Sequence, residues 1–475
     1  MKQLAGHTFF VVILAFCLVI LFSVGAQAAA YTVTTTADNG AGSLRAAIAD
    51  ANLTVEDDEI NFSIPSSDPN CTAGGVCTIT LTSGQLVVNA TSTAGALTIT
   101  NTTGASRLFI SGNDTSRVFV VNPGANLSLE GVTITGGYGT VTPATPFRFG
   151  GGIYNNGGTL SLTNSSVSGN FSPAGGGAGG VGGGIYSTGT LTVTNSTVSG
   201  NNAELCNGCG TSGGGIYNDG GTASLTNSTV SGNTARYGGG IYNTGTLTIT
   251  SSTITANTAQ GAVGSGSGGG IFNSDSGSLI LTNTIVAGNL VINSSSPDIA
   301  GGISPTSSFN LIGGDPKLGS LADNGGQTQT HALLPGSPAI DAGNNSGAAT
   351  DQRGFARRVD LPSTPNATGG DGTDIGAYEL QSSPTAASVT ISGRVITSNG
   401  RGLFNALVAL TNENGETRYA RTSISGRYRF NDVAAGSSAV ITIVSKRYSF
   451  PPQVLMVTGE ALNVDFLAQD GLPKR

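Results

Sequence analysis

Charged residues are scarce in this chain. Asp, Glu, Lys and Arg make up 10% of the 475 residues, and the sequence has no tryptophan, two histidines and two methionines. So little charge argues against a charged disordered chain, and 74 glycines beside only 17 prolines, without a triplet period, argue against collagen. The composition therefore favours repetitive β structure.

Long apolar runs are missing after the first thirty residues. The run from Phe9 to Val24 follows Lys2 and ends at the small residues Ala26-Gln27-Ala28, which predicts a secretory signal peptide over residues 1–30. A retained membrane anchor is the alternative. We expect no membrane span in the mature chain and a secreted or cell-surface, extracytoplasmic location.

Cysteine is also rare. Without Cys17 of the signal segment, four cysteines remain in an oxidising compartment, and they predict two local disulfides. One alternative is a zinc site formed by all four cysteines, and another is redox chemistry within the second pair. The four residues are Cys71, Cys77, Cys206 and Cys209.

Charge is distributed unevenly along the chain. Residues 31–387 contain 9 basic and 21 acidic side chains, a net charge of −12, whereas residues 388–475 contain 10 basic and 6 acidic, a net charge of +4. The acidic body excludes nucleic acid as its partner. The basic end favours either an anionic cell envelope or a plain solvated face.

One phrase, Gly-Gly-Gly-Ile followed by an aromatic residue, occurs five times between residues 150 and 272. Inside each copy apolar residues alternate with Thr or Ser, which is the period of half-buried strands. Stacked about 4.8 Å apart, the copies can bury their apolar columns together. We expect three short strands per coil with Asn and Gly at the corners, giving a parallel β-helix of the right-handed form over residues 78–297.

An aromatic residue follows the aligned isoleucine in every copy. If the isoleucines point inward, the aromatic rings form a ladder outside the coils. This ladder is a candidate binding surface for an extracellular or cell-surface polysaccharide or protein, and a stack that only steadies the coils is the alternative. Outward threonine rows offer a second alternative, ice binding. The ladder residues are Tyr154, Tyr186, Tyr217, Tyr242 and Phe272.

Several segments resemble known bacterial families. The Gly-Gly-Ile-Tyr and Ser-Gly-Asn repeats resemble those of polymorphic outer-membrane proteins and other right-handed β-helix proteins. The stretch Gly42-Ser-Leu-Arg-Ala-Ala-Ile48 resembles the Cys-Ser-Leu-Arg-Glu-Ala family, and Ser43 is expected to cap a short helix that covers the first coil.

Two later segments resemble further families. The stretch that contains Asn310-Leu-Ile-Gly-Gly-Asp315 and Asp374-Ile-Gly-Ala-Tyr-Glu379 resembles the choice-of-anchor domain of type Q, which implies no chemistry. The stretch with Gly426-Arg-Tyr-Arg-Phe430 is similar to the carboxypeptidase regulatory-like domain, a small prealbumin-like β-sandwich.

The expected organisation is all-β. It comprises a signal peptide at 1–30, an N-terminal cap at 31–77, the β-helix at 78–297, the type Q segment completing or capping the helix at 298–380, a linker at 381–387 and the β-sandwich at 388–468.

Catalysis is not expected. Between residues 150 and 297 the only charged residues are Glu204, Asp219, Arg236 and Asp275, too few for clustered carboxylates. We therefore expect an adhesion or ligand-display protein whose contacts lie in the variable loops 171–181, 202–212, 234–237 and 258–267. A polysaccharide lyase or glycoside hydrolase of the pectate-lyase-like β-helix class is the alternative. The oligomeric state is not indicated.

Two acidic regions leave calcium open as a cofactor, and no other cofactor is expected. Glu56 to Glu59 and the aspartates between Asp298 and Asp374 are interpreted mainly as turn residues that bind backbone amides. Asp371 and Asp374 are the candidate calcium ligands. His331 is expected to be structural.

Overall fold

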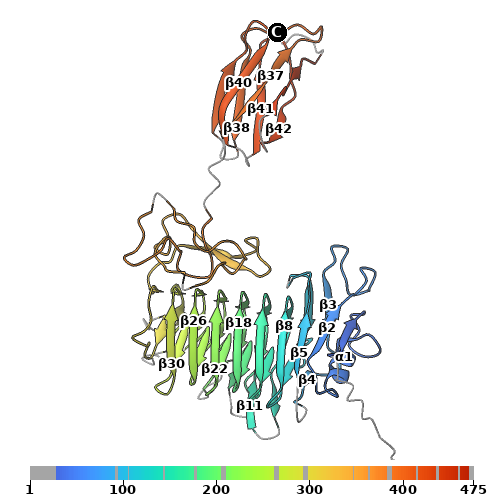
Figure 1. The fold of residues 1–475 in the computed structure, drawn as a ribbon, viewed down its shortest axis with the longest axis vertical. Coiled ribbons are helices and arrows are strands. Elements are labelled where there is room, and N and C mark those ends of the chain that lie inside the picture. Colours follow the sequence, from blue (N-terminus) through green and yellow to red (C-terminus); the bar gives the residue numbers. More distant parts are fainter. Residues whose placement is uncertain are drawn as a thin grey trace, which may run out of the picture. The chain divides into compact units, whose positions relative to one another are not determined.

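The computed structural model describes residues 28–90, 95–104, 106–142, 145–175, 179–204, 210–260, 267–292, 298–345, 347–361, 364–381, 388–412, 416–434, 438–457 and 461–469. The chain divides into two compact units, Met1–Leu380 and Gln381–Arg475, each with its own hydrophobic core. Figure 1 shows the first unit as a stack of coils and the second as a small β domain. No helix in these ranges is long and apolar enough to cross a membrane.

Sheet A is one long wall of the coiled unit. It has nine strands, and every neighbouring pair along it is parallel. Apolar side chains point inward and threonines outward, as in β26 (Thr246–Thr250), where Leu247 and Ile249 are buried. Its other strands are β1 (Ala30–Val33), β2 (Asp58–Phe62), β5 (Ala96–Thr100), β8 (Asn126–Glu130), β13 (Thr159–Thr163), β18 (Thr190–Thr194), β22 (Thr222–Thr226) and β30 (Ser278–Thr282).

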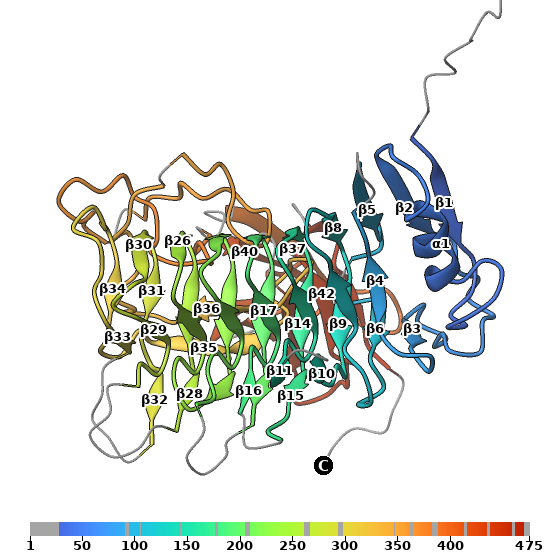
Figure 2. The same cartoon turned by 90° about the horizontal axis from the view of Figure 1, so that it is seen from below.

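Sheets B and C are the other two walls, and their strands also pair in parallel (Figure 2). Sheet B comprises β3 (Cys77–Thr80), β6 (Leu108–Ser111), β9 (Thr133–Thr135), β14 (Ser166–Ser168), β19 (Thr197–Ser199), β23 (Thr229–Ser231), β27 (Thr253–Thr255), β31 (Ile285–Val286) and β34 (Leu311–Ile312). Sheet C comprises β4 (Leu86–Val88), β7 (Phe119–Val121), β12 (Ile153–Asn155), β17 (Ile185–Ser187), β21 (Ile216–Asn218), β25 (Ile241–Asn243), β29 (Ile271–Asn273) and β33 (Ile299–Ala300).

The later coils have a fourth strand, so the expectation of three strands per coil was wrong there. Each fourth strand has two residues, and in three of them the second is a fully buried alanine, which suits a narrow side of the coil. Two residues are too few to show a period. Sheet D comprises β15 (Phe171–Ser172), β20 (Asn202–Ala203), β24 (Thr234–Ala235), β28 (Thr258–Ala259) and β32 (Leu290–Val291).

A small side sheet stands beside this stack. Strand β10 (Thr140–Thr142) pairs antiparallel with β11 (Thr145–Phe149), and β11 pairs in parallel with β16 (Gly180–Val181).

The strand register confirms the predicted inward columns. Leu160, Leu191, Ala223, Leu247 and Leu279 follow one another as direct partners across sheet A, and all are buried. Each large aliphatic side chain buried in this way contributes about 1.5–3 kcal/mol. The parallel β-helix predicted from the sequence is therefore confirmed.

A ladder of asparagine side chains marks one corner of the stack, where asparagine was expected. Each amide nitrogen donates to the amide oxygen of the next asparagine at 2.9 Å, and the last, Asn289, donates to Asp298 Oδ1 at 2.8 Å. A second corner repeats the pattern, with Asn218 donating to Asn243 and Asn243 to Asn273, both at 2.7 Å. The first ladder consists of Asn170, Asn201, Asn233, Asn257 and Asn289.

The predicted N-terminal helix is present as α1 (Leu44–Ala51). The Ser43 hydroxyl accepts the backbone N–H of Ala46 at 3.2 Å, which is the expected N-cap. Leu44, Ala47 and Ile48 are buried in the same cluster as the coil interior, so the helix covers the first coil.

Residues 298–380 extend the stack and then return along its side. β33 and β34 add the last strands of sheets C and B. The hairpin of β35 (Leu318–Ala322) and β36 (Thr330–Leu333) and the turns that follow then lie on sheet B. Thr328 Oγ1 donates to the Asn195 carbonyl at 3.0 Å, and Thr229 Oγ1 donates to Gln352 Oε1 at 2.6 Å. Part of the outer face of sheet B is therefore covered.

The second unit is the predicted β-sandwich. Buried residues of both sheets, among them Val395, Val408 and Phe430, form its core. One sheet contains β40 (Arg427–Ala434), β37 (Ser388–Ile396), β43 (Ala461–Leu462) and β44 (Phe466–Leu467), and the other contains β39 (Thr417–Arg421), β38 (Leu407–Asn412), β41 (Ser438–Val444) and β42 (Gln453–Met456).

The asparagine ladder gives a direct test of stability. Asn233 is fully buried, and Asn233→Ala removes amide bonds to Val198, Asn201 and Asn257. We expect unfolding to become easier by about 2–4 kcal/mol, because each buried polar group left without a partner costs roughly 1–3 kcal/mol. Urea unfolding followed by circular dichroism measures this. The outward-facing Thr248→Ala is the control, and equal midpoints for the two variants would show that the ladder has no stabilising role.

Candidate functional site

The aromatic ladder runs along the outside of sheet C. In each three-residue strand the first and third side chains point inward, so the middle ring points outward. Neighbouring ring centroids lie 5.5, 5.1, 4.8 and 4.8 Å apart from Tyr154 through Tyr186, Tyr217 and Tyr242 to Phe272. The first three pairs meet edge to face and the last is stacked. Every ring of the ladder therefore contacts at least one neighbouring ring.

Side chains from other segments close both ends of the ladder. Phe149 of β11 lies 5.4 Å from the Tyr154 ring and 4.5 Å from that of Tyr186, while Tyr237 lies 5.8 Å from Phe272. The guanidinium of buried Arg117 lies 5.2 Å from the Tyr154 ring centroid. Sequence reasoning missed these three residues. Only Tyr237 could have been noticed in the sequence, because it directly precedes a repeat. Phe149 and Arg117 stand outside the aligned positions.

Asp219 belongs to the ladder and is not an isolated surface acid. It accepts the hydroxyl hydrogen of Tyr186, and its other oxygen accepts from Thr244 Oγ1 at 3.3 Å. Burial, and then this carboxylate, raise the pKa of Tyr186 well above its ordinary value. The tyrosine is therefore a fixed hydrogen-bond donor and not a base.

The buried guanidinium of Arg117 is surrounded by hydrogen-bond acceptors. Its guanidinium donates to the carbonyls of Phe149 and Gly150 at 2.9 Å and to Gln85 Oε1 at 2.8 Å. Burial lowers its pKa to about 10. The side chain ties β11 and its neighbouring turn to the coils, which places Phe149 on the ladder.

The predicted recognition loops leave the coil from sheet D. Residues 176–178, 205–209 and 261–266 lie outside the described residues. The shortest loop, 234–237, is described throughout, and it carries Tyr237 with the Arg236 guanidinium 5.6 Å from that ring's centroid. Phe171, which opens β15, contacts Tyr138 at 5.7 Å. Aromatic residues therefore lie both at the roots of these loops and on the ladder.

Of the two predicted disulfides, one is present. Cys71 and Cys77 are joined close to the start of sheet B. Cys206 and Cys209 lie outside the described residues, so their pairing stays a prediction.

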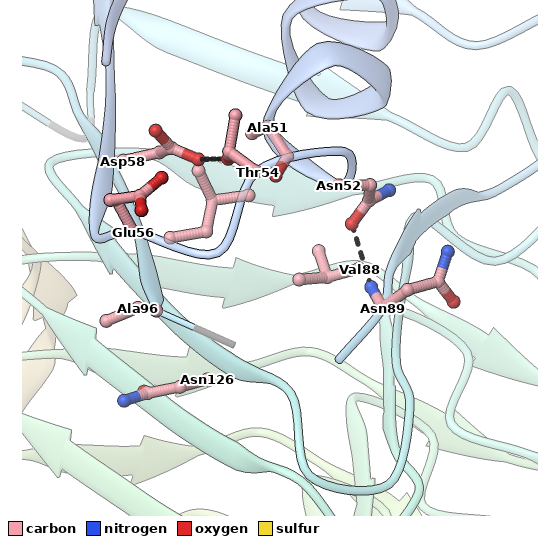
Figure 3. A pocket seen from close by; sticks show the side chains of 11 residues that line it. Ala51, Asn52, Thr54, Glu56, Asp58, Val88, Asn89, Ala96 and Asn126 are labelled. Atoms are coloured by element: carbon pink, nitrogen blue, oxygen red, sulfur yellow. Dashed lines mark hydrogen bonds between the residues drawn. The ribbon is translucent and has the colours of Figure 1, made fainter. Parts of the chain in front are cut away.

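The carboxylates of the acidic turn after α1 accept hydrogen bonds from the chain itself, and Figure 3 shows the bond from Thr54 to Asp58. Asp58 accepts the hydroxyl of Thr54 and the N–H of Ala29 at 3.1 Å, and Asp57 accepts the N–H of Ala96 at 2.7 Å. The hollow between Glu56 and Asn126 has a volume of about 20 Å³, room for about one water. It is too small for a sugar.

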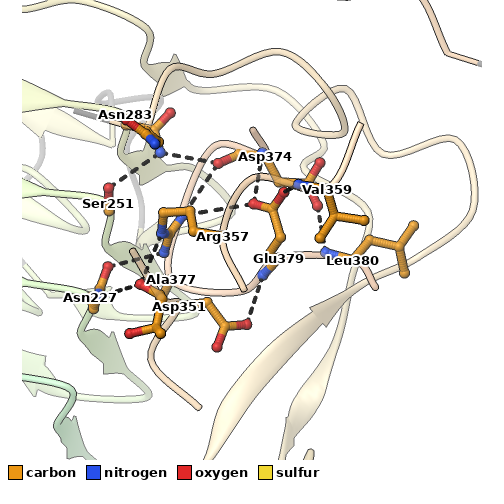
Figure 4. A network of polar contacts seen from close by, with 12 residues as sticks. Asn227, Ser251, Asn283, Asp351, Arg357, Val359, Asp374, Ala377, Glu379 and Leu380 are labelled. Atoms are coloured by element: carbon orange, nitrogen blue, oxygen red, sulfur yellow. Dashed lines mark hydrogen bonds and ion pairs between the residues drawn. The ribbon is translucent and has the colours of Figure 1, made fainter. Parts of the chain in front are cut away.

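A buried polar network joins the returning segment to the coils (Figure 4). Arg357 is fully buried, donates to Asn227 Oδ1 at 3.1 Å and lies 3.9 Å from Glu379 Oε2. Glu379 in turn accepts the N–H groups of Val359 and Asp374 at 3.0 and 2.9 Å. These contacts attach residues 351–380 to the coils. The buried polar groups of Arg357 and Glu379 bind other groups of the chain.

The two calcium candidates, Asp371 and Asp374, lie close to this network. Asp374 accepts the N–H of Asp341 at 2.8 Å and that of Leu380 at 2.6 Å, and burial raises its pKa to about 6. Asp371 Oδ2 accepts the N–H of Asn345 at 3.4 Å. No three His, Cys, Asp or Glu side chains in the described ranges are grouped as metal ligands would be. Calcium at Asp371 or Asp374 therefore stays a prediction.

His331 lies buried between β36 and the coils. Its Nδ1 is 2.7 Å from the Gly319 carbonyl and must donate to it, so Nε2 accepts the Ser231 hydroxyl at 2.8 Å. Burial lowers the pKa of His331, and the Gly319 bond partly opposes this. The ring is a neutral bridge between the returning segment and β23, in agreement with a structural role.

Sequence comparison assigns the second unit. Residues 390–468 match the family model of the carboxypeptidase regulatory-like domain. This confirms the resemblance predicted for that stretch. The sequence has no match among curated proteins.

Comparison with solved structures gives a weak likeness. A pectate lyase, Pel9A, aligns with 75% of this chain and 97% of its own at 16% identity, with a TM-score of 0.38. A likeness this weak bears on neither substrate nor activity. The function of the coiled unit therefore has to be inferred from its own residues.

The histidine bridge predicts a pH effect on stability. The folded-state pKa of His331 is lowered, so the unfolded chain binds more protons in acid, and the stabilisation is complete above the ordinary value of about 6.5 and is lost below it. We expect the wild-type chain to lose more stability than His331→Gln between about pH 7.5 and pH 5. Urea midpoints at both pH values measure this. Identical pH dependence in the two proteins would exclude His331 as the titrating group.

Proposed function

We propose that this chain is a non-catalytic extracytoplasmic β-helix protein, secreted or held at a bacterial surface, that serves adhesion or ligand display. Its partner would be an extracellular or cell-surface polysaccharide or protein. Residues 298–380 would act as a choice-of-anchor type Q segment, and the coils as repeats of the polymorphic outer-membrane-protein kind.

One observation carries the non-catalytic part of the proposal: three of the few carboxylates of the coils bind structural partners. Asp219 binds Tyr186, Glu204 accepts the N–H of Ala174 at 2.9 Å, and Asp298 ends the asparagine ladder. Glycan cleavage needs two carboxylates on either side of a bond, or a base beside a metal. The described part of the coils offers neither arrangement.

The recognition surface is proposed on the side where sheets C and D meet. The aromatic rings of sheet C and those at the loop roots provide rigid apolar area, and such area suits both sugars and proteins. The rings inside the ladder contact one another, so the proposed contacts to a partner are Phe149 and Tyr237, the partly exposed rings that other segments add to its two ends.

Substitutions at the two ends of the ladder test the placement. We expect Phe149→Ala with Tyr237→Ala to weaken binding to target cells or polysaccharide about fivefold to fiftyfold, because each aromatic ring that packs on the partner contributes roughly 1 kcal/mol. Quantitative cell- and glycan-binding assays measure this. Thr192→Ala on the outer face of sheet A is the matched control. If the double variant binds as well as this control, recognition lies elsewhere.

Activity assays test the proposal as a whole. Incubation of the chain from residue 31 with acidic polysaccharides, with and without calcium, should release neither unsaturated nor reducing ends, since no acid and base are poised on the described walls. Chain cleavage that persists after repeated purification would establish the enzyme alternative.

A further inference from the structure

Arginine is concentrated on one outer face of the carboxypeptidase regulatory-like domain. Arg394 of β37 and Arg427 of β40 are direct partners in an antiparallel pair, and Arg429 lies two residues further along β40. Tyr428 and Phe430 are buried, so the arginines alternating with them point outward. Like charges directly opposite one another destabilise a sheet. An anion bound between them would offset that repulsion.

A fourth arginine joins this face from the other sheet. Arg421 of β39 lines, together with Ser423 and the three arginines above, a groove of about 570 Å³. None of the four forms an ion pair within the described residues. Asp465 is nearby, but its carboxylate accepts the backbone N–H of Arg394, at 2.7 Å. Among the described residues, the groove is therefore a cationic site whose arginines form no ion pair.

Two large apolar side chains project beside the groove. Ile424 lies in the turn between β39 and β40 and is 84% exposed, and Phe404 lies in the loop between β37 and β38 and is 65% exposed. The two loops are in contact, since Asn405 N–H donates to the Thr422 carbonyl at 3.0 Å. We call Phe404 and Ile424 the apolar tip.

The arginines of the groove flank this tip. Arg421 Nη1 donates to Asn405 Oδ1 at 3.1 Å, and Arg394 Nε donates to the Ser425 carbonyl at 3.3 Å. Exposed apolar side chains surrounded by cations suit a partner that has an anionic surface and an apolar layer beneath it.

We propose that this end of the domain docks on an anionic phospholipid surface. Headgroup phosphates bind in the arginine groove, where guanidinium groups can each donate two hydrogen bonds, and the apolar tip enters the interfacial layer. A soluble polyanion would satisfy the arginines but would leave Phe404 and Ile424 without a role. The net charge of +4 for residues 388–475 agrees with this proposal, because an anionic surface attracts it. The net charge of −12 for residues 31–387 is repelled by such a surface.

Vesicle sedimentation tests the proposal with the chain from residue 31. We expect binding to vesicles of phosphatidylcholine with phosphatidylglycerol, little binding to phosphatidylcholine alone, and weakening by salt. Each arginine near an anionic surface contributes about fivefold, so changing Arg394, Arg421 and Arg427 together to Gln should weaken binding roughly a hundredfold.

Substitution of the tip separates a membrane from a soluble polyanion. Phe404→Ser with Ile424→Ser should abolish most vesicle binding, whereas Val454→Ser, a change at a 76% exposed residue of β42, should not. Circular dichroism of each variant verifies the fold.

Equal binding to neutral vesicles, or full binding by the tip variant, would overturn the proposal. If only the arginine variant loses vesicle binding, and an acidic polysaccharide competes with the vesicles, the groove would instead be assigned to a soluble polyanion. Neither readout depends on recognition by the coiled unit.

Discussion

The amide-to-amide hydrogen bonds between successive coils are the constraint on which the first unit depends. A buried asparagine such as Asn233 must meet another amide at the same place one coil further on, or polar groups are left without partners. That requirement fixes the number of inward residues per coil and places all length variation outside the core. The ladder ends at Asp298, whose carboxylate can accept from Asn289 without needing a partner that continues the stack.

The same constraint explains where charge can be placed. A repeat that stacks identical side chains would also stack identical charges, so the walls carry threonine and serine. The few ions are exceptions held by local partners, as Arg117 is by carbonyl groups and Asp219 by Tyr186. The coiled unit therefore offers shape, aromatic area and hydroxyl groups, while the concentrated positive charge is in the sandwich.

The returning segment decides which walls are available to partners. Its contacts through Gln352, His331 and Arg357 cover the later strands of sheet B. These contacts do not cover the outward rows of threonine on sheet A. Burial lowers the pKa of His331 and raises that of Asp374, so the two groups affect the pH dependence of this attachment in opposite directions. The arginines of the sandwich groove form no ion pair among the described residues, so their charge is available to the proposed phospholipid.

The repeat determined the strand period, the inward columns and the asparagine corners, and the stretch Gly42–Ile48 determined the helix after Ser43. Each of these follows from the order of near neighbours in the chain. The match at residues 390–468 likewise agrees with motifs visible in the chain. Only the tertiary structure decided the fourth strand, the wall covered by residues 317–380, the arrival of Phe149 at the ladder and the pairing of Arg394 with Arg427. These contacts depend on the path of turns and loops between distant residues, and no local period records that path.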